Sequence, residues 1–450
     1  MAILSRQTDP AACSDTARVP ALRIDAAELH DSVLDPVLSS MTLLNEIAGR
    51  HPEAVSFAAG RPYEGFYDTR QLAGYLNTFE TYLREERGLK DEDVTRTFFQ
   101  YGRTKGVIHE LIARHLENDE GLQVDPESVL VTTGCQEAMV LVMRALCRDP
   151  RDVILTSFPS YVGFLGAARL VGMPVRGVRE GEAGIDADDL VVQIRRARRE
   201  GLRPRACYVV PDFANPSGAT MTRAGRQHLL DVARQEDILL VEDNPYSMFR
   251  LGGSRLPTLR ALDREGRVVY LGSFAKTAFA GARIGYVIAD QPVVDGAGGT
   301  TRFVDELAKL KSMLTLNTST VAQAVIGGFL LENGCSAERA SVREAAVYRA
   351  NLGHVLRGLA ERFGEGKQNG TVTWNTPIGG MFTVVTVPFQ ADETMLEYSA
   401  RHFGVLWTPM RHFYAGTGGL NQLRLSYSVL SREQIETGLD RLAALVADRN

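Results

Sequence analysis

The sequence has few cysteines, no long hydrophobic run and no dinucleotide-binding motif. Its five cysteines lack CxxC spacing, which argues against a zinc site or a disulfide framework, so we expect no metal and a reducing compartment. No apolar run is long enough to cross a bilayer, and residues 1–10 have no apolar signal core, so we expect a cytoplasmic protein without membrane contacts. Because no GxGxxG segment follows an apolar strand, an NAD enzyme is not indicated.

Positively charged residues are slightly fewer than negatively charged ones. The 50 Lys and Arg residues are outnumbered by 55 Asp and Glu, and the net charge of −5 argues against nucleic-acid binding as the main function. Hydrophobic residues at 44% and charged residues at 23% are typical of a globular protein. With 450 residues the chain is too long for one typical core, so we expect two domains.

From residue 125 onward, short apolar runs such as Val129–Thr132 alternate with longer amphipathic stretches. Continuous apolar strands separated by helices predict an α/β fold with a mainly parallel sheet flanked by helices. After about residue 300 the pattern changes to long helices and two strand-like runs, which predicts a smaller α+β domain. We therefore expect an N-terminal arm (1–30), a large domain (31–300, with part of the small domain from 31–70), and a helical connection with the small domain (301–450).

A lysine follows one of these apolar runs at a position where its amine can act as a nucleophile. Val268–Gly272 is a predicted buried strand, Ser273 and Lys276 follow in a tight turn, and Arg283 lies seven positions beyond the lysine. Partial desolvation lowers the pKa of a lysine and frees its amine as a nucleophile, while a hydroxyl and a guanidinium bind phosphate. The segment indicates a lysine that holds pyridoxal phosphate. The alternative is an ordinary strand end with a lysine that reaches solvent.

Two earlier junctions add groups that suit the same cofactor, because ligands bind beyond the carboxyl ends of parallel strands. Gly134, Cys135 and Gln136 open a helix whose free backbone amides can hold a phosphate. Tyr161 follows the next strand and can stack on a planar ring. A simple glycine turn and ordinary packing are the alternatives at these two places.

Two later junctions supply partners for a pyridine ring. Asn215, in an Asn-Pro-Ser-Gly turn, can donate to a phenolate oxygen. Asp243 can pair with a protonated ring nitrogen, and Tyr246 can reach the same phenolate. The alternatives are a plain turn for the Asn215 segment and a helix N-cap for Asp243. The ordered set of five junctions, rather than any single one, predicts a pyridoxal-phosphate site.

These motifs resemble those of the fold-type-I pyridoxal-phosphate aminotransferases of class I, over about residues 36–445. The most similar branch contains the aminoadipate, kynurenine and aromatic amino-acid aminotransferases. The resemblance implies an aspartate-aminotransferase-like fold and a transaminase with bound pyridoxal phosphate. The matching segments are Asn215–Gly218, Asp243–Tyr246, Ser273–Lys276, Arg283 and Arg424.

The resemblance also implies a role for each residue. For catalysis it assigns Lys276 to the Schiff base with the cofactor, Asp243 to the pyridinium proton and Tyr161 to stacking on the ring. It assigns Arg424 to the substrate α-carboxylate through a bidentate fork. The remaining implied contacts are Asn215 and Tyr246 with the phenolate, Ser273, Arg283, Gly134, Cys135 and Gln136 with phosphate, and Asn215, Gly60 and Arg61 with substrate.

Two upstream segments extend the resemblance. Residues 57–62, which include Gly60 and Arg61, resemble the substrate loop of the family. Tyr101 resembles the tyrosine that in relatives reaches across a homodimer to the phosphate of the neighbouring subunit. The chain departs from the pattern at Ala275, where relatives often have a second serine, and at Ser217, which replaces the commoner threonine.

The implied reaction is ping-pong transfer of an amino group between an α-amino acid with an aromatic or large side chain and a 2-oxo acid. Residues 56–67 and 98–105 are similar to arylglycine-forming transaminases of peptide-antibiotic pathways. Elimination, cyclisation or decarboxylation on the same cofactor is the alternative, because cofactor motifs do not select the reaction. A transcription regulator with an aminotransferase-like domain would need a helix-turn-helix domain, which about 30 irregular residues cannot supply.

Overall fold

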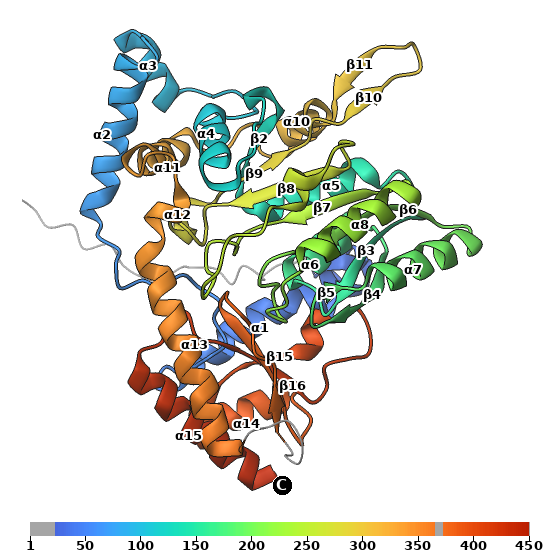
Figure 1. Cartoon of the computed structure of the whole chain (residues 1–450), viewed down its shortest axis with the longest axis vertical. Helices are drawn as coiled ribbons and strands as arrows, with labels where there is room; N and C mark the ends of the chain where they lie inside the picture. Colours follow the sequence, from blue (N-terminus) through green and yellow to red (C-terminus); the bar gives the residue numbers. More distant parts are fainter. Residues whose placement is uncertain (1–22, 365–371, 450) are drawn as a thin grey trace, which may run out of the picture.

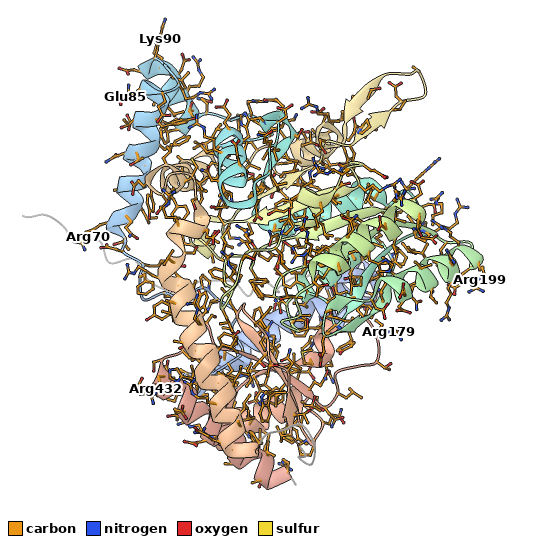
Figure 2. The ribbon with its side chains drawn as sticks, viewed as in Figure 1. Arg70, Glu85, Lys90, Arg179, Arg199 and Arg432 are labelled. Atoms are coloured by element: carbon orange, nitrogen blue, oxygen red, sulfur yellow. The ribbon has the colours of Figure 1, made fainter. Side chains whose placement is uncertain are left out.

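The computed structural model describes residues 23–364 and 372–449, so residues 1–22 of the predicted arm lie outside it. The chain forms a large sheet with helices on both sides, in the upper part of Figure 1, and a smaller sheet with long helices below it. Charged side chains such as Arg70, Lys90 and Arg432 point outward from the surface (Figure 2). Among the described residues, no helix combines the length and the apolar character that a membrane crossing needs.

The large sheet has eight strands. In spatial order they are β2 (Val129–Thr133), β9 (Ile284–Ile288), β8 (Val268–Ser273), β7 (Leu239–Asp243), β6 (Arg203–Val209), β3 (Asp152–Phe158), β4 (Val175–Gly181) and β5 (Gly184–Ile185). Strands β8, β7, β6, β3 and β4 are parallel, whereas β9 is antiparallel to both β2 and β8. The predicted mainly parallel sheet is therefore confirmed, with β9 inserted antiparallel near its β2 edge and the short β5 antiparallel to β4 at the other edge.

Helices cover both faces of this sheet because successive side chains of a buried strand point to opposite faces. In β6, Ala206 and Tyr208 belong to the core under one set of helices, and Cys207 and Val209 belong to the core under the other set. The first set is α5 (Gly134–Leu146), α6 (Val162–Val171) and α10 (Phe303–Leu314). The second set is α7 (Ala187–Arg199), α8 (Arg223–Gln235) and α9 (Leu259–Leu262). A further group packs against β2 and β9 and consists of α2 (Arg70–Glu85), α3 (Asp91–Phe99), α4 (His109–Glu120) and α11 (Thr320–Glu332).

The smaller sheet is antiparallel and consists, in order, of β12 (Thr373–Trp374), β13 (Phe382–Thr386), β16 (Gln422–Ser426) and β15 (Thr408–Pro409). The helices around it are α13 (Val342–Phe363), α14 (Glu393–Phe403), α15 (Arg432–Arg449) and α1 (Pro36–Arg50). An early segment joins this unit, because β1 (Val55–Ser56) pairs in parallel with β14 (Val405–Leu406). Residues near the start of the chain therefore lie beside residues near its end.

The remaining elements are short. They are the hairpin of β10 (Pro292–Val294) and β11 (Thr300–Arg302), the helix α12 (Ala337–Ala340), and the 3₁₀ turns η1 (Ala26–Glu28), η2 (Asp31–Leu34), η3 (Pro126–Ser128), η4 (Ala280–Ala282) and η5 (Met410–Phe413). The carboxyl ends of β6, β7 and β8 face the smaller sheet, since Arg424 on β16 reaches Asn215 in the loop after β6. The candidate site described below lies where these strand ends approach the smaller sheet.

Candidate active site

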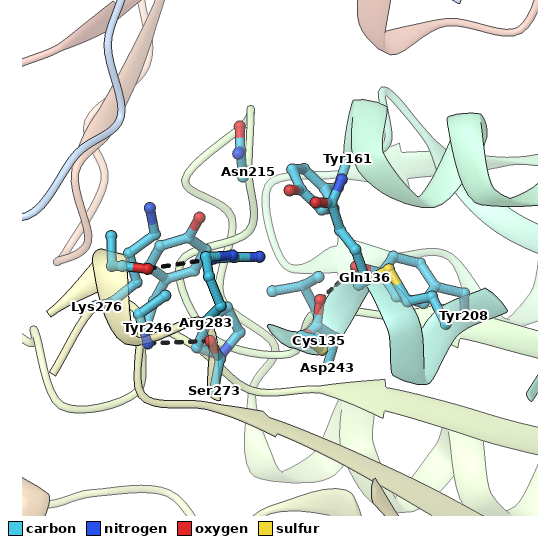
Figure 3. Close-up of a pocket in the computed structure, with 15 residues that line it drawn as sticks. Cys135, Gln136, Tyr161, Tyr208, Asn215, Asp243, Tyr246, Ser273, Lys276 and Arg283 are labelled. Carbon is cyan, nitrogen blue, oxygen red and sulfur yellow. Dashed lines mark hydrogen bonds between the residues drawn. The ribbon is translucent and has the colours of Figure 1, made fainter. Parts of the chain in front are cut away.

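A cavity of about 160 Å³ lies at the carboxyl ends of β6, β7 and β8, next to the first turn of α5. Figure 3 shows Lys276, Tyr246 and Arg283 on one side of it and Cys135, Asp243 and Tyr208 on the other. The structure thus brings most of the predicted cofactor residues together. Those that line the cavity are Cys135, Gln136, Tyr161, Asn215, Asp243, Tyr246, Ser273, Lys276 and Arg283.

Lys276 follows β8 and turns its amine toward the early substrate-loop segment. Its Nζ donates a hydrogen bond to the Gly60 carbonyl at 2.6 Å, and no carboxylate among the described residues pairs with it. Burial, followed by the positive charges of Arg424 and Arg283, lowers the pKa of Lys276 to about 8. A lysine in this state has an appreciable fraction of free amine near neutral pH and can act as a nucleophile.

The start of α5 forms one wall of the cavity. Gly134 has φ +75°, and a Cβ placed on it would lie 2.4 Å from Nη2 of Arg283, so only glycine lets this guanidinium approach. The helix has no side-chain N-cap, which leaves its first amides free for an anion. Ser273 and Arg283 line the same cavity. These donors match the oxygen atoms of a phosphate.

Asp243 ends β7 and is buried. One carboxylate oxygen, Oδ2, accepts a hydrogen bond from the Tyr208 hydroxyl at 2.6 Å, and Oδ1 accepts from the Cys135 thiol at 3.5 Å. Burial raises the pKa of Asp243 to about 6, although both hydrogen bonds favour its ionised form. Because its partners are side chains rather than backbone amides at a helix start, Asp243 is not an N-cap. A protonated ring nitrogen would be a favourable partner.

Arg424 comes from β16 and lies across the cavity from the large sheet. It donates to Oδ1 of Asn215 at 2.7 Å, to the Ala58 carbonyl at 2.8 Å and to Oγ1 of Thr408 at 3.2 Å. Its Nε is buried without a partner, and no carboxylate of the described residues pairs with it. Burial lowers its pKa to about 10. A buried guanidinium that lacks a carboxylate favours an anionic ligand.

A second cavity of about 590 Å³ adjoins the first and shares Tyr161, Asn215, Tyr246 and Lys276 with it. Gly60, Arg61 and Arg424 line this cavity as well. Arg61 differs from Arg424 because it is exposed and lies 3.6 Å from Glu64. Among the predicted site residues, Tyr101 lines neither cavity and has 83% of its surface exposed.

Sequence reasoning missed Tyr208. Tyr208 lies inside the apolar run that forms β6, and only the polar residues that follow such runs were considered as site candidates. The available signal was alternation: Tyr208 points to the same face of β6 as Ala206, toward α5, whose first residues form the cavity wall. The hydroxyl at the end of this buried ring needs a partner, and Asp243 provides it.

Comparison with known proteins shows the family to which the chain belongs. Residues 72–442 match the family described as aminotransferase class I and II. The chain belongs to this family. It is 52% identical over 421 residues to an (S)-3,5-dihydroxyphenylglycine transaminase from Amycolatopsis orientalis, covering 94% of both chains. It is 31% identical to a 2-aminoadipate transaminase from Thermus thermophilus, covering 87% of this chain and 90% of the relative.

Solved structures agree with the fold. A kynurenine aminotransferase from Pyrococcus horikoshii, in complex with pyridoxamine phosphate (PMP), superposes with a TM-score of 0.77 at 27% identity, covering 94% of this chain and 96% of that one. The predicted aspartate-aminotransferase-like fold and the predicted family branch are confirmed. The protein is a pyridoxal-phosphate-dependent aminotransferase, and the donors in the first cavity fit that cofactor.

Proposed function

We propose that this aminotransferase exchanges the amino group of an arylglycine with the oxo group of a 2-oxo acid. The main observation behind this proposal is Arg424, which is buried, lines the larger cavity and has no carboxylate partner among the described residues, so it suits an α-carboxylate. The relative from Amycolatopsis orientalis, named as a 3,5-dihydroxyphenylglycine transaminase, supports an aryl ring attached directly to the α-carbon.

The lining of the larger cavity favours a ring over a second carboxylate. Small side chains, among them Ala48, Ala54 and Ala58, line this cavity together with the aromatic ring of Phe413. A distal carboxylate, such as that of 2-aminoadipate, would need a second free cation. The two further basic groups, His51 and Arg61, already face Glu397 at 3.2 Å and Glu64 at 3.6 Å. A neutral aryl group has no such requirement.

Each residue then has a defined task. Pyridoxal phosphate supplies the electron sink that makes an α-proton labile. Lys276 Nζ takes the proton from the substrate α-carbon, and its lowered pKa makes this possible near neutral pH. Asp243 would hold the proton of the ring nitrogen, and Arg424 would fix the α-carboxylate.

The remaining residues hold the cofactor. Asn215 and Tyr246 would bind its phenolate oxygen, and Tyr161 would pack against its ring. Ser273, Arg283 and the first amides of α5, at Gly134, Cys135 and Gln136, would hold its phosphate. Gly60 and Arg61 complete the substrate side of the site.

We also propose a homodimer in which Tyr101 completes the site of the partner subunit. Phe99, two positions before Tyr101, is an apolar side chain that is 83% exposed, and Met313 and Leu314 at the end of α10 are 86% and 58% exposed. The chain that follows α10 reaches this region, because Oγ1 of Thr320, at the start of α11, donates to the Phe98 carbonyl. The division at residues 30 and 300 and the cytoplasmic location remain proposals.

Half-transamination of the purified holoenzyme tests the substrate. The change in cofactor absorbance is followed with 3,5-dihydroxyphenylglycine, phenylglycine, phenylalanine and 2-aminoadipate. We expect kcat/KM for an arylglycine to exceed that for phenylalanine by about tenfold or more, because one methylene is worth that much in a shaped pocket. Faster reaction with 2-aminoadipate would contradict the proposal. A 2-oxo acid with the intact carbon skeleton of the substrate, formed while the amino group stays on the cofactor, identifies transamination, whereas elimination releases ammonia and decarboxylation releases carbon dioxide.

A further inference from the structure

Tyr208 is held in one orientation behind the cofactor cavity. Its ring is buried and stacks on Phe164, with ring centroids 4.0 Å apart and planes 10° apart. Its hydroxyl donates to Oδ2 of Asp243 at 2.6 Å, which is short for a neutral donor and typical of a bond to a carboxylate. The packing of the ring therefore fixes where this oxygen of Asp243 lies.

Cys135 approaches the other oxygen from the first turn of α5. Its sulfur lies 3.5 Å from Oδ1 of Asp243. Burial, and then the negative charge of Asp243, raise the pKa of Cys135 well above its usual value, so the group stays a thiol. A thiol can donate a hydrogen bond, whereas a thiolate next to a carboxylate would repel it.

We propose that Tyr208 and Cys135 are positioning residues that hold the two oxygens of Asp243 and keep its carboxylate ionised for the ring nitrogen of the cofactor. The inference rests on the proposed role of Asp243. A carboxylate offers about four acceptor positions, and these donors occupy two of them. The others remain for a ligand in the cavity. Two fixed oxygens also prevent the carboxylate from rotating away from that ligand.

The electrostatic environment of Asp243 explains why these two hydrogen-bond donors matter. Asp243 is buried and has no cationic partner among the described residues, so burial works against its charge. The titratable groups that face it are Tyr208 from β6, Cys135 from α5, Tyr161 before α6 and Tyr246 after β7. In the part of the chain that the structure describes, Tyr208 and Cys135 alone donate to it, and both hydrogen bonds lower its pKa. Loss of either donor destabilises the ionised form and raises the pKa of Asp243.

Binding of PMP to the full-length protein stripped of cofactor tests this. PMP forms no covalent bond with Lys276, so its affinity reports the non-covalent contacts. In the wild type, affinity should fall as the pH drops through about 6, where Asp243 becomes protonated. We expect the midpoint to rise by about one pH unit in Tyr208→Phe, which makes binding about fivefold weaker at pH 6. The phosphate titrates equally in all variants and cancels in the comparison.

Cys135 provides graded controls. Cys135→Ala should raise the midpoint by less than Tyr208→Phe, because a thiol is a weak donor, and Cys135→Ser, which keeps a donor, should restore it. Asp243→Asn should lose this pH-dependent component altogether. If Asp243→Asn keeps it, the proposed role of Asp243 is wrong. If Asp243→Asn loses it but Tyr208→Phe and Cys135→Ala match the wild type, the positioning role alone is refuted.

A second measurement needs no variant of Tyr208. Alkylation of Cys135 in the cofactor-free protein, read by peptide mass, should be faster in Asp243→Asn than in the wild type at pH 8. The reason is that removing the carboxylate charge lowers the pKa of the thiol. Equal rates in the two proteins would show that the thiol and the carboxylate do not interact, and the inference for Cys135 would be overturned.

Discussion

Replacement of Arg424 by lysine is the sharpest test of the substrate site. The guanidinium satisfies Asn215 and Ala58 through different nitrogen atoms and lies 4.4 Å from the ring centroid of Phe382. A lysine has one nitrogen, so it cannot hold these groups and a carboxylate in a fork at the same time. The substitution therefore keeps the positive charge and removes the forked arrangement of hydrogen-bond donors.

The expected loss of kcat/KM in Arg424→Lys follows from the burial of the site. Losing one partner of a buried hydrogen-bonded charge pair costs about 2 to 5 kcal/mol. Lysine still attracts an anion, so we expect the lower part of this range, about 2 to 3 kcal/mol, or about 30-fold to 150-fold in kcat/KM. Arg424→Met, which also removes the charge, should lie near the upper end. The loss should appear mainly in KM, because the carboxylate is bound before and during the reaction.

Arg61→Gln is the matched control. Arg61 lines the same cavity but is exposed and faces Glu64 at 3.6 Å, and exposed pairs contribute about 1 kcal/mol or less. We therefore expect less than about a tenfold change in kcat/KM. Steady-state kinetics with one arylglycine donor measures all three variants. If Arg424→Lys behaves as the wild type while Arg61→Gln loses activity, the carboxylate is held by Arg61 and our reasoning fails.

Three further predictions concern the cofactor and the assembly. Borohydride reduction of the holoenzyme followed by peptide mapping should place the cofactor on Lys276, and a label elsewhere would contradict the assignment. Asp243→Ala should lower kcat by about 100-fold or more while the circular dichroism spectrum stays unchanged. Mixed dimers of inactive Tyr101→Phe and Lys276→Ala subunits should regain activity because one site of the hybrid is intact, whereas a fully active monomer would refute the shared site.

The cofactor half of the site was predictable because it depends on local signals. Asn215, Asp243 and Lys276 each follow an apolar strand, and parallel strands bring their carboxyl ends to one edge. Tyr208 was not predictable in the same way, because it lies inside a strand. Its hydrogen bond to Asp243 requires that β6 and β7 be neighbouring strands, and only the strand order of the sheet shows that they are.

The substrate half depends on contacts that no local pattern contains. Arg424 reaches the Ala58 carbonyl, 366 positions away in the chain, and the pairing of β1 with β14 is what brings Ala58 there. The resemblance to a family supplied Arg424 as a candidate, but alternation of apolar residues did not. The antiparallel insertion of β9 between β2 and β8 was likewise invisible, since its apolar run looks like that of a parallel strand.

The two halves share one physical feature, which is a buried charge without an opposite charge of its own. Within residues 23–364 and 372–449, Arg424 has no carboxylate partner and Asp243 has no cationic partner. Burial lowers the pKa of Arg424 and raises that of Asp243, so it favours the neutral form of each. Such groups destabilise the empty protein and are stabilised by ligands of the opposite charge. An amino acid brings a carboxylate to Arg424, and a protonated ring nitrogen brings a cation to Asp243. The cost of keeping these charges apart in the fold is therefore recovered when cofactor and substrate bind, which links affinity for both to the same folded arrangement.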